Sequence, residues 1–547
     1  MSCCDLAERW MSLFKQSFII NSCLYMWQSS LTARLLSVFW AYMSKYWQSG
    51  FIYHTVSRDI VAGSCTYRLF VCMVGNLERL LSRAALTVRN YYFKDGCGIL
   101  ARPLFWYFTV GGGIITAILV SFIDRQAALK IAAGVLTTVV VFLLPEAGLY
   151  LAALFLPFLP FNLLALLGAL TAIAYLAKVV VNGRADICRS SLLIPVLVFF
   201  VILLCGAVTS VLPKSSAYEF SISAVAMLYL FLTVNLIDNK KKLNIFLACL
   251  ALAAAAVAAY AIYDYYYGVT FVDLQKGWVD PELNPNIKNR ASAVFENPNL
   301  LAQYFVLVIP VFAAFTAVVK RVGYKFLLAS IAVLAGIALV LTYSRGGLYG
   351  FIFAMAVLAV IRGRKFFPLF LAVAVIGVFF LPPTVIDRLA TADNLNDSSV
   401  VYRFDIWKST LLMIKDYWLT GVGVGTQAFM RVYYVYMMNS AIMPHAHNLY
   451  LQLLSETGVF GLAAFMLLMY KIFQTVFRIS SSNLSYLKWM NAGIAGSIAG
   501  FLLQSLFDYG LWYYKLGVLF WILIAVYIVV EKLYVVEKGV AFNGKRL

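Results

Sequence analysis

The sequence predicts an all-α, polytopic bundle of transmembrane helices with a large external loop that contains amphipathic helices. Hydrophobic residues make up 63% of the 547 residues and charged residues only 12%, against about 45–50% and about 25% in soluble domains. The apolar runs are long and lack the alternation of a membrane β-barrel, so helices are the backbone that can satisfy its own hydrogen bonds in lipid. The formal net charge of +19 therefore bears on membrane topology, and no nucleic-acid partner is expected.

Apolar runs after residue 103 mark the predicted spans. A span needs about 20 apolar residues, and because several runs are shorter we expect about 12 to 14 spans. The two runs that meet near Pro145 are also compatible with one broken or re-entrant element. The runs are residues 104–123, 131–145, 147–160, 162–181, 191–212, 217–237, 243–263, 299–319, 325–343, 346–361, 366–381, 447–470, 488–508 and 515–532.

Short basic connections predict the orientation of these spans, because Lys and Arg are retained on the cytoplasmic side during insertion. The basic clusters fall on one side if the spans alternate, which places both termini in the cytoplasm. The same alternation places two long loops outside, at residues 264–298 and 382–446. Loops longer than about 12–15 residues are usually functional or disordered, so we expect the chemistry there. The clusters are at 178–189, 240–242, 320–325, 362–365, 471–488 and 532–546.

Three regions follow from this topology: a cytosolic N-terminal region at residues 1–103, a transmembrane domain at 104–535 and a cytosolic tail at 536–547. The N-terminal region is basic and contains cysteines without paired CxxC spacing, which argues against both a zinc site and disulfides. An amphipathic helix on anionic lipid and an ordinary helical cytosolic cap both remain open for this region.

Arg345 is the first candidate site residue, in the run Thr342-Tyr343-Ser344-Arg345-Gly346-Gly347 at the outer end of a predicted span. An arginine at a helix end can simply extend its charge to the membrane surface. The two glycines favour an anion site instead, because they leave the guanidinium and nearby backbone N–H groups open.

Two of the three histidines lie together, His445 and His447, where the external loop enters an apolar run. An imidazole, with an ordinary pKa of about 6.5, can accept a proton at neutral pH. A metal site is not expected, because residues two apart do not share a helical face and no third ligand lies nearby.

Arg403 lies between these points, in a segment in which Phe404, Trp407, Leu411 and Ile414 recur at helical spacing. The spacing predicts an amphipathic helix against the membrane face, with Arg403 on its polar side. Alone, Arg403 would be interpreted as a solvated charge.

Four motifs in order resemble the O-antigen ligase and O-antigen polymerase family of membrane glycosyltransferases. The chain has the Ser-Arg-Gly-Gly turn at Arg345, Arg403-x-x-x-Trp407 in the large loop, and His447-Asn448-x-x-Leu closing that loop. Upstream, Arg290 precedes Asn297-Pro298-Asn299 in the same way. The resemblance covers about residues 190–530, and four ordered motifs are more specific than any one of them.

The resemblance implies a C-type glycosyltransferase-like fold that takes a glycan from an undecaprenyl diphosphate carrier, without cofactor or metal. Arginines would hold the diphosphate and the histidine would act on the acceptor hydroxyl, with inversion at the sugar carbon. The acceptor would be a glycan, a lipid or a protein, at the external face of a bacterial cytoplasmic membrane. Carried onto this sequence, His447 is the base, Arg345, Arg403 and Arg290 bind diphosphate, and the candidate contacts to donor or acceptor are His445, Asn448, Asn299 and Tyr434.

Some interpretations stay open at this stage. Asp508, at the outer end of a predicted span, either orients the base or caps a helix, and the cap is the simpler interpretation. Tyr433, Tyr434 and Tyr436 fit an interfacial belt better than sugar stacking. The alternative function is a flippase or transporter of polysaccharide or lipid-linked glycan, which would place polar residues near the midplane in repeated halves.

Overall fold

The computed structural model describes residues 125–182, 190–268, 289–363, 365–379, 381–390, 398–439, 443–481 and 483–538. All of them belong to one compact unit of the chain, Asp95–Leu547. The N-terminal region 1–103, the predicted span at 104–123, most of the loop 264–298 and the end of the tail lie outside the described residues.

The described residues form helices and contain no strand, which confirms the all-α prediction. Most boundaries agree with the apolar runs to within a few residues, because those runs end at proline, glycine or charged residues. The helices are α7 (Arg125–Leu143), α8 (Pro145–Phe155), α9 (Phe161–Asn182), α10 (Leu193–Val208), α11 (Pro213–Leu236), α12 (Lys240–Tyr267), η1 (Ala293–Phe295), α14 (Pro298–Val318), α15 (Val322–Val340), α16 (Arg345–Arg362), α17 (Phe366–Val378), α18 (Pro383–Ala390), α19 (Ser398–Tyr417), α20 (Thr426–Tyr436), α21 (Leu449–Ser480), α22 (Ser485–Gln504), η3 (Gly510–Trp512) and α23 (Tyr514–Lys538).

Eight helices within the described ranges are long and apolar enough to cross a membrane: α9, α11, α12, α14, α15, α16, α21 and α23. Shorter apolar helical stretches occur in α7, α10 and α17. The protein is therefore a polytopic helical membrane protein. Helix α8 has 11 residues and measures roughly 16 Å at about 1.5 Å per residue, about half of the hydrocarbon thickness, so it cannot cross alone.

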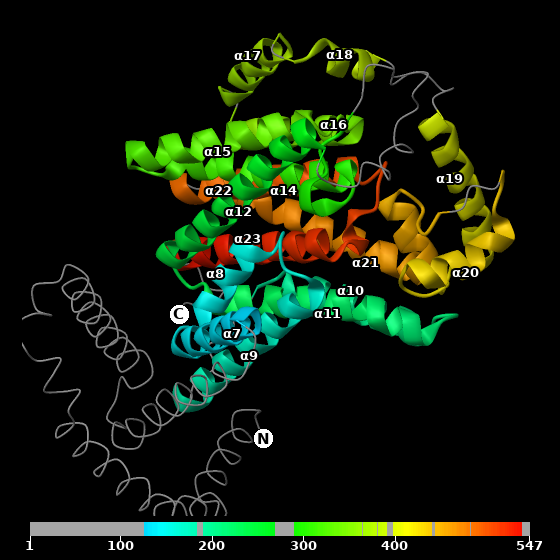
Figure 1. Ribbon diagram of the computed structural model, residues 1–547, viewed down its shortest axis with the longest axis horizontal. Helices are drawn as coiled ribbons and strands as arrows, with labels where there is room; N and C mark the ends of the chain where they lie inside the picture. The colour runs from blue at the N-terminus through cyan, green and yellow to red at the C-terminus, as the bar shows by residue number, and fades with distance from the viewer. Residues whose placement is uncertain are drawn as a thin grey trace, which may run out of the picture. The chain divides into compact units, whose positions relative to one another are not determined.

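Helices α14 and α23 occupy the middle of the bundle, and α17 lies at its edge (Figure 1). Almost the whole apolar window of α23 is buried within the protein, whereas α17 has no buried residue. The exposed side chains of α17 include leucine, valine and phenylalanine, which suits a helix that contacts lipid.

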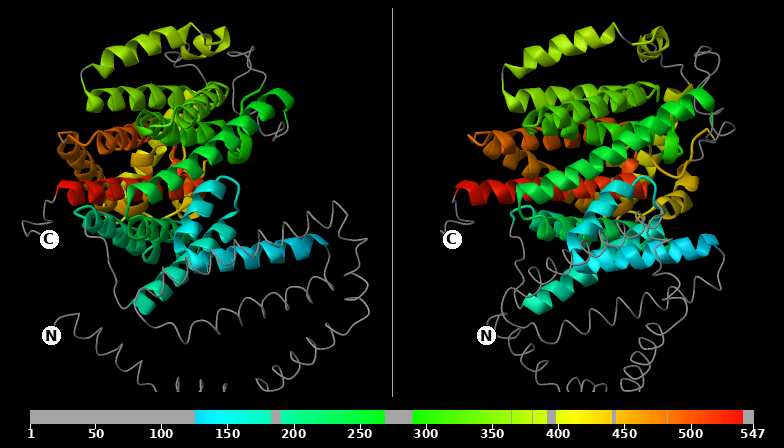
Figure 2. Two further views of the ribbon diagram at one scale, coloured as in Figure 1. Left: turned by 90° about the vertical axis from the view of Figure 1, so that its left-hand side faces the viewer. Right: turned by 60° about the vertical axis from the view of Figure 1, so that its left-hand side comes forward.

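Helices α14, α16 and α22 lie side by side (Figure 2), and small residues line their contacts. A Cβ added at Gly500 of α22 would lie 2.4 Å from the carbonyl oxygen of Gly350 on α16. One added at Gly493 would lie 2.5 Å from Ala314 Cβ on α14. Close backbone approach of this kind replaces the hydrophobic effect as the source of helix association in lipid.

Polar contacts gather at the two ends of the long helices. At one end Glu146 pairs with Lys242 at 2.7 Å and with Lys178 at 3.8 Å, while Lys240 pairs with Glu537 at 2.5 Å. Basic residues from separate predicted cytoplasmic connections thus meet, as alternating spans require. The candidate site residues lie at the other end, beyond which α19 and α20 pack (Figure 1). Which end faces the cytoplasm stays a prediction.

Candidate functional site

Arg290 holds the chain before α14 against the turn before α16. Its side chain is only 6% exposed, and its Nε donates to the Thr342 carbonyl at 2.8 Å. One terminal nitrogen donates to Asn299 Oδ1 at 3.0 Å. Two of the predicted substrate residues, Arg290 and Asn299, therefore contact each other, and both contribute to the shape of the turn that leads to Arg345.

Asp264, at the end of α12, binds the backbone just after Arg290. Its buried carboxylate accepts from the backbone N–H groups of Ser292 at 3.1 Å and Ala293 at 2.9 Å. The sequence analysis did not single out Asp264, which is the first residue of the predicted external loop 264–298. Its signal was a single acidic residue in a run of tyrosines at a span end.

Arg345 is the first residue of α16 and is half-buried. The preceding Ser344 caps the helix, accepting from the Gly347 N–H at 3.3 Å. A Cβ at Gly346 would lie 3.6 Å from Gln504 Cγ and 4.0 Å from Phe507 Cβ. Arg345 therefore begins its helix beside the loop that follows α22.

His447 lies in a tight turn that enters α21. Its φ of +47° is a left-handed conformation that a non-glycine residue rarely adopts, and its N–H donates to His445 Nδ1 at 3.2 Å. The imidazole Nδ1 lies 3.6 Å from Asp508 Oδ1, slightly longer than a hydrogen bond. The side chain with the predicted chemistry thus faces a carboxylate, the arrangement that orients an imidazole.

Asp508 lies after the end of α22, whose C-cap is Ser505, and it faces His447. The contact favours the base-orienting interpretation over the helix cap. Burial alone would raise the pKa of Asp508, but interactions with His447, His445 and Arg403 outweigh burial and lower the pKa to about 2. Asp508 is therefore ionised at neutral pH.

His445 is buried and has a different electrostatic character. Burial, together with the neighbouring His447, lowers the pKa of His445 to about 3, so this imidazole is neutral at pH 7. Its ring lies 5.5 Å from the ring of Trp512 and its Nδ1 accepts a hydrogen bond from the adjacent backbone. These contacts make His445 a support for the turn.

Helix α19 packs on the histidine turn through Trp407. The indole N–H donates to the Ala446 carbonyl at 3.0 Å, and the ring lies 6.4 Å from Phe507. Arg403 is one turn earlier on the same helix and acts on the pKa values of both Asp508 and His445. Phe507 therefore links the two halves of the site, because it is next to Trp407 on one side and to Gly346 on the other.

The structure confirms the helix predicted at α19, but only part of its predicted apolar stripe is exposed. Phe404 and Leu411 are exposed as expected of a membrane-facing stripe, whereas Ile414 is buried. Ile406 and Met413, which the stripe did not include, form the buried face together with α20. The predicted stripe is therefore exposed at Phe404 and Leu411 but buried in the protein at Ile414.

The remaining predicted contact residues have structural partners or lie apart. Asn448 caps α21, accepting from the Tyr450 and Leu451 N–H groups at 2.9 and 3.0 Å, and its amide donates to the Leu506 carbonyl at 2.9 Å. Tyr434 lies on α20 with 48% of its surface exposed. Asn448 therefore fixes the turn between His447 and the loop after α22.

A break in α21 packs against the glycine-rich loop 421–425, which joins α19 to α20. Gly458 has φ +65° inside the helix, and a Cβ there would lie 2.1 Å from the Leu419 carbonyl oxygen. The carbonyls released near the break accept from Val422 N at 2.8 Å and Gly423 N at 3.0 Å. Irregular backbone is tolerated at membrane depth when protein groups satisfy it in this way.

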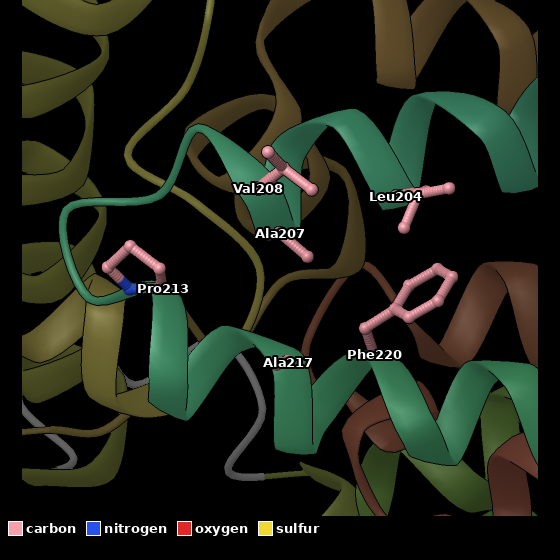
Figure 3. Close-up of a pocket in the computed structure, with 6 residues that line it drawn as sticks. All are labelled: Leu204, Ala207, Val208, Pro213, Ala217 and Phe220. Carbon is pink, nitrogen blue, oxygen red and sulfur yellow. The ribbon is translucent and has the colours of Figure 1, made fainter.

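A cavity of about 280 Å³ lies between α10 and α11. Leu204, Ala207, Val208, Pro213, Ala217 and Phe220 line it (Figure 3). None of these side chains can bind a phosphate or a sugar hydroxyl. The cavity is therefore a lipid-type surface, and the candidate site is the polar end of α14, α16, α21 and α22.

Residues 330–466 match the family model described as O-antigen ligase. This segment of the chain is similar to that family. The matched segment runs from α15 into α21 and so includes Arg345, Arg403, His445 and His447, while Arg290 and Asp508 lie outside it. No curated protein matches the chain. The O-antigen ligase domain supports a glycosyltransferase-like membrane protein of polysaccharide biosynthesis that transfers lipid-linked glycan.

Proposed function

We propose that this protein transfers a glycan from undecaprenyl diphosphate to an acceptor hydroxyl at the external face of a bacterial cytoplasmic membrane. The observation that carries the proposal is the placement of His447 against Asp508, with Arg403 acting on the same carboxylate. An oriented base and a cation in one polar end suit a reaction that deprotonates a hydroxyl and releases a diphosphate.

In the proposed reaction the acceptor oxygen attacks the anomeric carbon, and the bond from that carbon to the phosphate oxygen breaks. The electron pair leaves with the carrier diphosphate. The acceptor proton passes to His447 Nε2, since Nδ1 faces Asp508. Attack opposite the leaving group inverts the anomeric centre, and no metal is assigned a role.

The arginines have separate tasks in this proposal. Arg345 and Arg403 bind the diphosphate, whose negative charge grows as the bond breaks, and planar guanidinium groups suit it. Arg290 is the third proposed diphosphate ligand and also shapes the Arg345 turn through Thr342. His445, Asn448 and Asn299 hold the walls of the site, and Tyr434 is a contact for the glycan.

The external placement of the site rests on the basic clusters. Lys178, Lys240 and Lys242 lie at the end opposite to His447, which retention of Lys and Arg assigns to the cytoplasm together with both termini. Two single-cysteine variants, Lys320→Cys and Tyr434→Cys, test this orientation in a background without other reactive thiols. A membrane-impermeant thiol reagent added to intact cells should label only the cysteine at position 434.

The transfer assay uses purified protein, an undecaprenyl-diphosphate glycan and three acceptor classes: a second carrier-linked glycan, a lipid core and a peptide with hydroxyl side chains. His447→Ala should lower the rate about 10²–10⁴-fold, the usual contribution of a general base. Arg345→Ala should weaken donor binding. Arg321→Ala is the matched control, because Arg321 is exposed at the opposite end of α15.

The acceptor that is used separates a polymerase, a ligase and a protein oligosaccharyltransferase. Movement of intact glycolipid across vesicles without bond formation would instead support the flippase alternative. That outcome is disfavoured because the polar residues gather at one end of the helices, whereas transporters bind near the midplane.

A further inference from the structure

Glu456 is a buried carboxylate inside the span α21, two turns below the histidine turn. It is 1% exposed. Its Oε1 accepts from Gln452 Nε2 at 2.8 Å and from the Gly425 N–H at 3.2 Å, and Tyr509 OH lies 3.4 Å from its Oε2. One carboxylate thus contacts three segments: the glycine-rich loop, α21 itself and the loop that carries Asp508.

Gln452 extends this contact to the histidines. Its Oε1 accepts from the backbone N–H of Ala446 at 2.7 Å, and Ala446 is the residue between His445 and His447. The Ala446 carbonyl in turn accepts from Trp407 on α19. Two hydrogen bonds therefore join Glu456 to the backbone whose left-handed conformation sets the direction of the His447 side chain.

The break at Gly458 makes this connection necessary. Residues 449–457 form a short helical segment, and beyond Gly458 the long part of α21 takes a different direction. A two-turn segment has little stability of its own. Its position depends on contacts from outside, which the glycine-rich loop supplies through backbone hydrogen bonds and Glu456 supplies through its side chain.

An ionisable residue in a membrane helix costs at least about 2.5–3.5 kcal/mol on insertion scales, and such residues mark functional sites. For packing alone a leucine would serve better. A leucine could not make the hydrogen bonds by which Glu456 joins three separate segments, so Glu456 anchors two loops and a broken helix.

We propose that Glu456 is a positioning residue that, through Gln452, fixes the Ala446 backbone and so holds His447 against Asp508. The catalytic consequence rests on the proposed glycan transfer, whereas the structural consequence does not. Glu456 is not given contact with substrate, and Gln452 is the residue through which it acts.

The test compares Glu456→Leu with Glu456→Gln in the transfer assay and by hydrogen exchange. Glutamine can still accept from Gln452 and Gly425, so Glu456→Gln should keep kcat within about threefold, while Glu456→Leu should lower kcat about tenfold or more with donor KM unchanged. Exchange at residues 443–449 should accelerate in Glu456→Leu only.

Two further variants keep the test decisive. Gln452→Leu removes the hydrogen bonds to both Glu456 and Ala446 but leaves the Glu456 contacts with Gly425 and Tyr509 in place. It should reproduce the kcat loss if Glu456→Leu does not fold. Glu531→Leu, at a fully buried glutamate of the opposite end, should lower thermal stability while the folded fraction keeps its kcat. These readouts separate a positioning role from general destabilisation.

The outcomes distinguish the two proposals. If the wild type does not transfer glycan, the proposed function fails and the exchange data still judge the anchor. Suppose that the wild type transfers glycan and that His447→Ala abolishes the transfer. If Glu456→Leu and Gln452→Leu then have the wild-type kcat, and hydrogen exchange at residues 443–449 is as slow as in the wild type, the positioning role is refuted.

Discussion

His447 and Asp508 face each other from loops that precede α21 and follow α22, with Nδ1 of the imidazole 3.6 Å from Oδ1 of the carboxylate. In the proposed reaction, this contact holds the imidazole with its other nitrogen toward the acceptor hydroxyl. Asp508→Asn should therefore lower kcat, though less than the approximately 10²–10⁴-fold expected for removal of the base. Donor KM should stay the same. A loss equal to that of His447→Ala would assign Asp508 a direct part in proton transfer.

Arg345 is expected to bind two oxygens of the diphosphate at once. Arg345→Lys keeps the charge but loses the planar pair of donors, so donor KM should rise about tenfold, the loss of one charge-assisted hydrogen bond. Lysine should perform better than alanine. Equal KM values for the lysine variant and the wild type would show that only charge matters at this position.

His445 makes stability depend on pH. Its pKa is lowered to about 3 in the folded protein, against about 6.5 unfolded, so the unfolded chain binds more protons between these values. Stability is then full above about pH 6.5 and declines as the pH falls toward 3. Thermal unfolding in detergent at pH 7 and pH 5 should show a smaller difference for His445→Gln than for the wild type. The glutamine oxygen can replace Nδ1 as an acceptor.

Gly458 permits the break in α21. Gly458→Ala should destabilise the protein, because a positive φ costs a residue with a side chain roughly 1–3 kcal/mol and the new Cβ would meet the Leu419 carbonyl. Gly336 on α15 is the matched control, since a Cβ there has no atom within 4 Å. Gly336→Ala should change stability by less than about 1 kcal/mol. Melting temperatures by tryptophan fluorescence compare the two.

Glu531 pairs with Arg478 at the end opposite the site and is fully buried. Its carboxylate also accepts from the Ser190 hydroxyl at 2.7 Å. Because Arg478 is 53% exposed, Glu531→Ala leaves no buried charge, and its cost comes from the lost hydrogen bonds and packing. Glu531→Ala should therefore lower the unfolding temperature, and Arg478→Ala combined with it should lower it by less than the sum of the two single changes. Denaturation of all three variants gives the coupling between the residues.

The spans could be predicted because the free energy of exposure to lipid depends on the local sequence. Apolar runs are separated at Pro145, Pro213 and Pro298, which begin α8, α11 and α14. The motifs around Arg345 and His447 were also local. Glu456 and Gln452 were missed as a unit, because their hydrogen bonds reach Gly425 and Ala446 across loops. The break at Gly458 was hidden in the same way, since its partners lie in the chain around Leu419.

The faces of α19 show a further reason. A periodic stripe of apolar residues indicates which side avoids water, but lipid and protein interior both satisfy that condition. Phe404 and Ile414 belong to one predicted stripe, yet the first is exposed and the second is buried. Sequence periodicity alone could not separate these two apolar environments.

The close fit of α14, α16 and α22 at Gly350, Gly493 and Gly500 has a consequence for traffic through the protein. Helices whose backbones are in contact cannot separate without losing this packing. In the proposed reaction we therefore expect a bulky glycan to reach the site from another side. Helix α17, which has no buried residue, lies outside this tightly packed group.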